Sequence, residues 1–492
     1  MSGYWDGFSM TLQNGSGAWQ SWRDDIADRL AAYAIGLDTE GRREHDAGAK
    51  RILLDTLAVG LGAYRHRAAA IARQYVSFFP PHPAGATIWG TRARAPMPVA
   101  ALANGALLRC YDYNDFMVGK YSPGHPSDML SPLLAVAEWR GSSGRELLDA
   151  LAIGYEIASA IYDVSPSEDS GWDHANLSAL GATGAIARLL GLTVEQATEA
   201  FGIVAIQHIQ SNEIESSAPN KRGDLTMWKR FHGADIMRYA LEACLLASKG
   251  AEGPVRPFRG DLGFLKIFRA PEDPAPILAE RLRGGRPMTA VDRTNFKRWP
   301  VGSRGQSAIQ ATIDARRQMP AGTSIDRIEV RTEPGVFHHL VTIRNDPWCP
   351  VSREAADHSL PYIVGTAALD GFVKVASFDQ DKVLDPDRAA FVAERVRISV
   401  DETLVRNDTA LNLSEVEIVT TAGDRFIGKA RPAPGHQLNP LTDTDLAEKL
   451  HESADGILPT EQLNRLIAAV SGIGNMGDVQ TLTALLVGEN EL

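Results

Sequence analysis

Apolar residues recur with a helical period through most of the first 290 residues. Ser143 and Glu146 form the pattern of a capping box immediately before one such run, and Thr193 and Gln196 repeat the pattern before another. Glycine and alanine are frequent within these runs, which is typical of helices that pack closely. These signals predict a large region built only from helices.

Farther along the chain, apolar and polar residues alternate at every second position. Segments 326–332, 395–402 and 414–430 have this period, which is typical of strands with one buried face. In the last segment, Ala-Gly-Asp at 422–424 indicates a hairpin turn. Between the strands, residues 352–371 have the apolar face of a helix. The pattern predicts a smaller α+β domain.

Helical patterns return after the proline-rich segment 432–440, and a chain of 492 residues exceeds the size of one hydrophobic core. The C-terminal helices are therefore expected to complete the first domain, with the α+β domain inserted as a lid. The predicted fold class is mainly α. It has a flexible tail at 1–18, an all-helical domain of 19–290 plus 434–492, and an α+β lid domain of 291–433.

Composition limits the partners of the chain. A formal net charge of −11 argues against binding to nucleic acid or to an anionic membrane, because both require a basic surface. No signal peptide and no run of about 18 apolar residues is present, so we expect a cytoplasmic protein. Cys110, Cys244 and Cys349 lie far apart, which argues against a zinc site, a cluster or disulfides.

The loop 110–130 holds polar residues suited to proton transfer. Asp112, Asp115 and His125 lie in a stretch that glycine and proline prevent from forming one helix. A carboxylate beside a histidine can fix its tautomer, as in a general base. The helix expected from about Met129 would also offer backbone N–H groups to an anion. Alternatively, the histidine satisfies a buried carbonyl and the aspartates cap turns.

Two basic segments, 220–238 and 293–306, stand out in an acidic chain. Aromatic residues such as Trp228 and Trp299 are interleaved with their lysines and arginines, which indicates partly buried positions. A buried cation needs an anionic partner, so these segments could bind a polycarboxylate. The alternative is that each is a solvated face.

The remaining histidines are weaker candidates. His174 follows Asp173 at the start of a predicted helix. His338 and His339 are expected on a strand, on opposite faces, and His358 on an apolar helix, where a buried structural histidine is typical. No HExxH or GxSxG motif is present, so the residues favour proton transfer on an acidic substrate over metal or serine chemistry.

Seven segments, in order, resemble the MmgE/PrpD family, which includes 2-methylcitrate dehydratase, cis-aconitate decarboxylase and iminodisuccinate epimerase. They are ILLDTLAVGLGAY, ANGALLRCYDYNDF, GHPSDMLSPLLAVAEWRG, GRELLDALAIGYEIA, ARLLGLTVEQATEAFGI, TMWKRFHGAD and REAADHSLPYIVGTAALDG. The resemblance implies an all-α domain with an α+β lid, a homodimer, no metal and no obligatory cofactor.

The resemblance also implies an active site between the two domains. Its catalytic positions correspond to Asp112, Asp115, His125, His174, Lys229 and Lys297. We add four candidates for substrate binding: Arg304, Ser127, Phe116 and Gln306. Phe116 replaces an expected threonine. Gly302 and Arg304 stand at about the places where the segment after the lid lysine usually has an acidic or cysteine residue and then a histidine.

The expected function is cofactor-independent dehydration of a 2-methylcitrate-like hydroxy polycarboxylate. His125 is expected to act as the base and His174 as the acid, although these roles could be reversed. A decarboxylase or an epimerase would use the same proton transfers. A non-catalytic protein that binds an acidic metabolite is the alternative from another class.

Overall fold

The computed structural model describes residues 24–167, 170–207, 209–215, 225–406 and 410–489, and the predicted tail, 1–18, lies outside them. The described chain is mainly helical. Its longer N-terminal helices are α1 (Asp25–Gly36), α2 (Asp46–Gly62), α3 (Arg67–Val76), α4 (Met97–Arg109), α5 (Leu130–Arg140), α6 (Gly144–Tyr162), α7 (Ala175–Leu190), α8 (Val194–Ile206) and α9 (His232–Ala247). Two shorter ones follow, α10 (Phe264–Ile267) and α11 (Ala275–Arg281).

Both predicted capping boxes are confirmed. Ser143 and Glu146 exchange hydrogen bonds at the start of α6, and Thr193 and Gln196 do so at the start of α8. The glycines of α7 serve close packing, as predicted. A Cβ atom on Gly181 would lie only 2.5 Å from a backbone oxygen of α6, so no larger side chain fits there.

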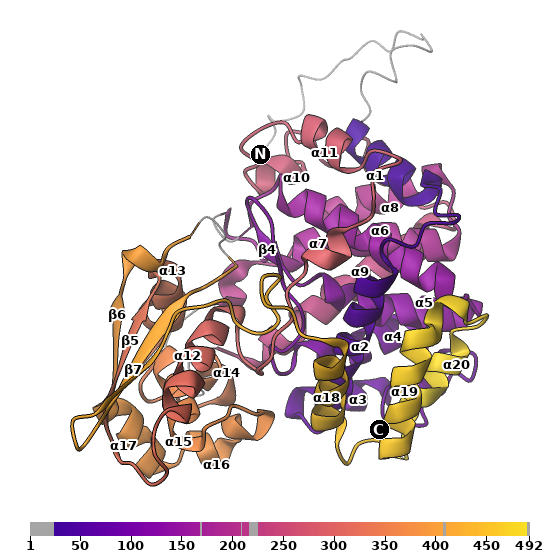
Figure 1. Cartoon of the computed structure of the whole chain (residues 1–492). Coiled ribbons are helices and arrows are strands. Elements are labelled where there is room, and N and C mark those ends of the chain that lie inside the picture. The colour runs from indigo at the N-terminus through magenta and orange to yellow at the C-terminus, as the bar shows by residue number, and fades with distance from the viewer. Residues whose placement is uncertain (1–23, 168–169, 208, 216–224, 407–409, 490–492) are drawn as a thin grey trace, which may run out of the picture.

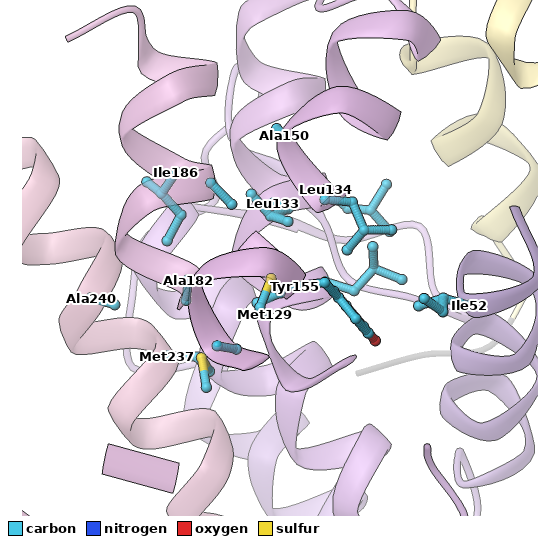
Figure 2. Packing of buried hydrophobic residues seen from close by; sticks show 14 of the residues in the cluster. Ile52, Met129, Leu133, Leu134, Ala150, Tyr155, Ala182, Ile186, Met237 and Ala240 are labelled. Carbon is cyan, nitrogen blue, oxygen red and sulfur yellow. The ribbon is translucent and has the colours of Figure 1, made fainter. Parts of the chain in front are cut away.

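One continuous apolar core joins the N-terminal helices to the end of the chain. Figure 2 shows part of this core, where Met129, Leu133 and Tyr155 lie among residues of neighbouring helices. The C-terminal helices are α18 (Asp443–Ala454), α19 (Thr460–Gly472) and α20 (Gln480–Thr483). They contribute to the same core: α18 and α19 pack beside α2, and α20 contacts α5 (Figure 1).

The second part of the molecule contains a four-stranded sheet, at the left of Figure 1. Its strands, in the order β6-β5-β7-β8, are β5 (Ile325–Thr332), β6 (Val396–Val400), β7 (Ser414–Thr420) and β8 (Arg425–Gly428). β5 pairs with β6 in parallel, whereas the other two pairs are antiparallel. All three predicted strand segments are confirmed, and Gly423, with φ +89°, lies in the expected hairpin turn.

Helices cover the sheet. Together with the strands they form a hydrophobic core that is separate from the core of the helical part. The helices are α12 (Gln306–Arg317), α13 (Pro334–Phe337), α14 (Arg353–Ala356), α15 (Leu360–Asp370), α16 (Gln380–Val383) and α17 (Pro386–Arg395). Ala311 and Val364 of these helices pack against Val330 and Ile418 of the strands. The domain boundaries and the role of this part as a lid stay predictions.

Two local predictions in the second part were wrong. His338 and His339 lie on a helical turn that continues α13, because Pro334 begins a helix there instead of a strand. The helix predicted over 352–371 is broken at His358. Ser359 accepts a hydrogen bond from the backbone of Tyr362 and starts a new helix.

Two small hairpins complete the fold: β1 (Ala86–Thr87) with β2 (Arg94–Ala95), and β3 (Met117–Val118) with β4 (Pro123–Gly124). The second hairpin carries the chain from Asp115 to His125, beside the cavity described below. In the described part of the chain, no helix has the length and apolarity needed to cross a membrane.

Candidate active site

A cavity of about 330 Å³ lies between the helical part and the sheet-containing part. Seven of the ten predicted site residues line it: Asp112, Phe116, His125, His174, Lys229, Lys297 and Arg304. The structure therefore brings together side chains from segments almost 200 residues apart.

Asp112 and Lys297 form a buried ion pair in the cavity wall. The Lys297 ammonium donates to both the backbone oxygen and Oδ1 of Asp112, each at 2.7 Å. Burial alone would raise the pKa of Asp112, but Lys297 and a hydrogen bond from His358 hold it well below its usual range. Asp112 is thus an ionised carboxylate, and it adopts an unusual backbone conformation with φ +45°.

His125 has a defined tautomer. Its Nδ1 lies 2.5 Å from the backbone oxygen of Asp115, and because a carbonyl only accepts, Nδ1 carries the proton. The neutral ring then has its lone pair on Nε2. Burial, with the positive charges of Arg109 and Lys297, lowers the pKa of His125 well below its ordinary value. The predicted orienting carboxylate is therefore replaced by a backbone carbonyl.

His174 faces His125, with 5.2 Å between the ring centroids. It lies directly before α7, and its Nδ1 is 3.4 Å from Oδ1 of Asp173. Burial would raise the pKa of Asp173, but His174 and His232 hold it well below its usual range. The ionised carboxylate of Asp173 therefore lies beside His174, one of the two predicted catalytic histidines.

Lys229 lies on a short 3₁₀ turn, Met227–Arg230, with its ammonium in the cavity wall. The carboxylate of Glu215 contacts this ammonium, and its other oxygen lies 3.4 Å from Nη2 of Arg344. Burial, helped by nearby arginines and opposed by Asp112, lowers the pKa of Lys229 to about 7. Residues 220–224 of the basic segment lie outside the described residues.

The sheet-containing part supplies further positive charge. Arg304, on the turn before α12, lines the cavity together with His339 and Arg344. Burial lowers the pKa of His339 to about 3, and Arg304 and Arg344 contribute to this shift. The positive charges of the two arginines thus add to burial in disfavouring the imidazolium, and the same charges suit an anionic ligand.

Three predicted residues do not line the cavity. Asp115 is buried and accepts hydrogen bonds from Tyr155, Thr294 and the backbone N–H of Ser127. Its carboxylate thus occupies the anion position that we expected at this helix start, and it braces the loop. Gln306 is also buried, and its side chain bonds only the backbone of residues 298–301.

Ser127 and Asp128 precede a helix but do not cap it. A 3₁₀ turn, Pro126–Met129, precedes α5, and no side chain caps either element. The side chains of Ser127 and Asp128 accept hydrogen bonds from Asn114 instead. Both residues hold the loop around His125 in place, away from the ligand space.

Arg109 is a cavity residue that sequence reasoning missed. Its Nε and Nη1 are buried and have no hydrogen-bond partner among the described residues. Oδ2 of Asp128 lies 3.9 Å from Nε, which is an ion pair without a hydrogen bond. At the end of α4 the residue resembles an ordinary favourable C-terminal cation. The available signal was its position among the apolar residues Leu107, Leu108 and Cys110.

His358 is the second missed residue. The break between α14 and α15 turns it towards the cavity, where Nε2 is 3.3 Å from Oδ2 of Asp112. Its Nδ1 is 2.5 Å from Oδ1 of the buried Asp357. Pro361 was the usable signal, because proline in the first turn of a helix marks a helix start just after His358.

Two domain descriptions match almost the whole chain. The MmgE/PrpD N-terminal domain matches residues 28–277, and the MmgE/PrpD C-terminal domain matches residues 299–473. The chain belongs to the MmgE/PrpD family. The resemblance seen in the seven sequence segments is confirmed.

The following relatives from the MmgE/PrpD family carry the names of two enzymes, a decarboxylase and a dehydratase. The chain is 26% identical to cis-aconitate decarboxylase of Homo sapiens over 457 residues, which cover 89% of each chain. It is 26% identical to 2-methylcitrate dehydratase of Salmonella typhimurium over 392 residues, covering 75% of this chain and 76% of the relative. The corresponding enzyme of Cupriavidus necator is 27% identical over 403 residues, or 78% of each. Both names are those of lyases.

The positions that depart from the MmgE/PrpD pattern lie together at the cavity. Phe116 and Asn295 exchange two backbone hydrogen bonds of 2.8 Å. These bonds hold the loop 110–130 beside the segment that carries Lys297. A Cβ atom on Gly302 would lie 3.5 Å from Oδ2 of Asp112 and 3.8 Å from Nε2 of His358. A side chain at 302 would therefore approach the carboxylate that His358 contacts.

A metal site was not expected from the sequence. Within the ranges that the structure describes, no three His, Cys, Asp or Glu side chains are grouped in a way that could hold a metal ion. The charged side chains that line the cavity are lysines, arginines and the carboxylates of Asp112 and Glu215, and histidines lie among them.

Proposed function

We propose that this protein is a lyase that dehydrates a 2-methylcitrate-like hydroxy polycarboxylate by acid–base catalysis, without a cofactor. The observation that carries the proposal is the facing pair His125 and His174 in a cavity lined by lysines and arginines. Such a reaction removes a proton next to a carboxylate and protonates the departing hydroxyl, so it needs two proton-transfer groups and compensation of negative charge.

His125 is the proposed base. Its pKa is lowered by burial and by the charges of Arg109 and Lys297, which disfavour the imidazolium. Carboxylates of a bound substrate would offset these charges and raise the pKa. The lone pair on Nε2 would then remove the proton next to the substrate carboxylate.

His174 is the proposed acid. Oδ1 of Asp173 lies 3.4 Å from Nδ1 of His174 and orients the ring, from which a proton would pass to the leaving hydroxyl. The 5.2 Å separation of the two rings leaves each histidine close to the same small molecule. The assignment could be reversed, and the pH dependence of each single variant would distinguish the two arrangements.

Lys229, Arg304 and Arg109 are proposed to hold the carboxylates. Removal of a proton next to a carboxylate places a second negative charge on that group, and fixed cations stabilise it most in a site with little water. Arg109 supports this role because its buried N–H groups have no hydrogen-bond partner in the described part of the chain. A planar guanidinium also matches the geometry of a carboxylate.

Decarboxylation of a cis-aconitate-like acid is the second candidate. Its support is that similarity to the human cis-aconitate decarboxylase extends over 89% of this chain, against 75% for the Salmonella dehydratase. The same cations would stabilise a carbanion formed by loss of carbon dioxide, and a histidine would protonate it. Epimerisation of an iminodisuccinate-like acid uses the same groups.

A binding protein without catalysis is the remaining alternative, and the departures at Phe116 and Arg304 support it. Closure of the sheet-containing part over the cavity, a homodimer and a cytoplasmic location remain predictions that accompany the proposal.

The test is incubation of the purified protein with citrate, 2-methylcitrate, cis-aconitate and related hydroxy or amino dicarboxylates, followed by mass spectrometry. Loss of water supports the dehydratase, loss of carbon dioxide the decarboxylase, and a stereochemical change at constant mass the epimerase. Thermal stabilisation by an acid without any product would support the binding protein and overturn the proposed function.

A further inference from the structure

Lys449, on α18, lies behind the cavity wall and makes three hydrogen bonds. It is fully buried, and its ammonium donates to Oδ1 of Asp55 at 2.7 Å, to the backbone oxygen of Lys297 at 3.0 Å and to that of Tyr113 at 3.1 Å. An ammonium group has three N–H donors, so all of them are used. Lys449 does not line the cavity.

Two of these bonds end at the segments that carry the Asp112–Lys297 pair. Tyr113 follows Asp112 directly, and the other acceptor belongs to Lys297 itself. The Tyr113 ring also lies 3.7 Å from the Lys449 ammonium, and its hydroxyl donates to the backbone oxygen of Arg298 at 2.7 Å. The two segments are therefore fastened to each other from behind.

The Asp112–Lys297 pair needs such support. Asp112 has a left-handed backbone conformation, which is costly for a residue with a Cβ atom and persists only where the surroundings enforce it. Lys297 is fully buried, and burial lowers its pKa, so its charge depends on contact with Asp112. A small displacement of either segment would break this contact.

Fold stability alone is a weak reason for the Lys449–Asp55 pair. Both side chains are completely buried, and removing two charges from water costs about as much as their attraction returns. Asp55, on α2, has the role of compensating the charge of Lys449.

We propose that Lys449 is a positioning residue, which holds the Asp112 loop and the Lys297 segment in register, with Asp55 as its fixed counter-ion. Its effect on turnover rests on the proposed function. Its effect on the geometry of Asp112 and Lys297 does not.

The test removes both charges together. Lys449→Met alone would leave the Asp55 carboxylate buried without a partner, so the variant of choice is Lys449→Met with Asp55→Asn. The matched control is Arg388→Met with Asp370→Asn, which removes a partly buried ion pair of the sheet-containing part that does not line the cavity. Thermal midpoint, kcat, KM and a crystal structure are measured for both.

We expect the Lys449 double variant to fold but to lose about 10- to 100-fold in kcat with a smaller change in KM, because misplacement of a site by about 1 Å has such an effect. Its Lys297–Asp112 contact should lengthen by more than about 0.5 Å, the tolerance of a functional site. The control should lose thermal stability at unchanged kcat.

An unchanged Lys297–Asp112 contact overturns the proposal whatever the kinetics show, and so does unchanged kcat in a protein whose wild type is active. If the wild type converts none of the acids, the proposed function has failed, and the crystal structure alone decides the positioning role. If the double variant fails to fold, the crystal structure of Asp55→Asn with Lys449 retained decides in the same way. There the loss of the counter-ion should loosen the same contact, and an intact contact overturns the proposal.

Discussion

The two walls of the cavity hold their polar groups in different ways. On the helical side, His125 bonds to a backbone oxygen, and Lys297 bonds to a backbone oxygen as well as to the carboxylate of Asp112. On the sheet side, Arg344 and His358 contact the side-chain carboxylates of Glu215 and Asp112. A bond to a carbonyl fixes a tautomer or a position, whereas a carboxylate partner can be replaced by another carboxylate. We therefore expect the helical wall to perform proton transfer, while cations of both walls hold the substrate carboxylates.

Removal of His125 should have the largest effect. Loss of a proton-transfer group lowers turnover by roughly 10² to 10⁴, so His125→Ala should reduce kcat by this factor with little change in thermal midpoint. The matched control is His339→Ala on the sheet wall, which should change mainly KM. Equal losses of kcat in both variants would contradict the division of labour between the walls.

Removal of Lys229 should come second. A charge-assisted hydrogen bond contributes about 1.5–3 kcal/mol, so Lys229→Ala should lower kcat/KM by roughly 10- to 150-fold. Lys120 lines the same cavity but is exposed and paired with Glu272. Lys120→Ala should therefore have only a small effect, since solvent screens its charge. Equal losses of kcat/KM in the two variants would refute the role of burial.

The pH dependence of KM should identify Lys229 directly. Burial lowers its pKa to about 7, so in the free protein the ammonium is charged below pH 7 and becomes neutral above it. KM for an anionic substrate should be constant below pH 7 and rise above it, by at most about tenfold per pH unit for one proton. Lys229→Arg, which keeps its charge, should abolish this rise. A rise that persists in the arginine variant would assign it to another group.

The smallest effect concerns Glu215. Its carboxylate contacts the Lys229 and Arg344 cations that would otherwise meet a substrate carboxylate. Since a partly exposed ion pair contributes up to about 1 kcal/mol, Glu215→Gln should lower KM by up to roughly fivefold. Glu213→Gln, in the same 3₁₀ turn but outside the cavity, is the control. A higher KM in the Glu215 variant would mean that Glu215 organises the site instead of competing for it.

Local patterns were sufficient wherever a structure depends on neighbours in the chain. The capping boxes at Ser143 and Thr193 involve residues three positions apart, and the strands need only an alternation of period two. Histidine in a proline-rich loop and lysine in an aromatic segment were enough to place His125 and Lys229 among the candidates. Local patterns misled at His339, where Pro334 begins a helix in place of the expected strand. They also misled at His358, where the apolar pattern did not mark the break before the helix that begins at Leu360.

The sequence by itself determined the mainly helical fold and the strands of the small sheet, because period and turn chemistry act over a few residues. It also indicated seven of the residues that line the cavity. Only the tertiary structure decided which charges meet. Lys297 pairs with Asp112 across 185 positions, and Lys449 with Asp55 across 394. Ionic contacts of this kind depend on distance and burial in space, which no local pattern contains. The same reason hid Arg109, whose importance comes from being buried without a hydrogen-bond partner in the described chain.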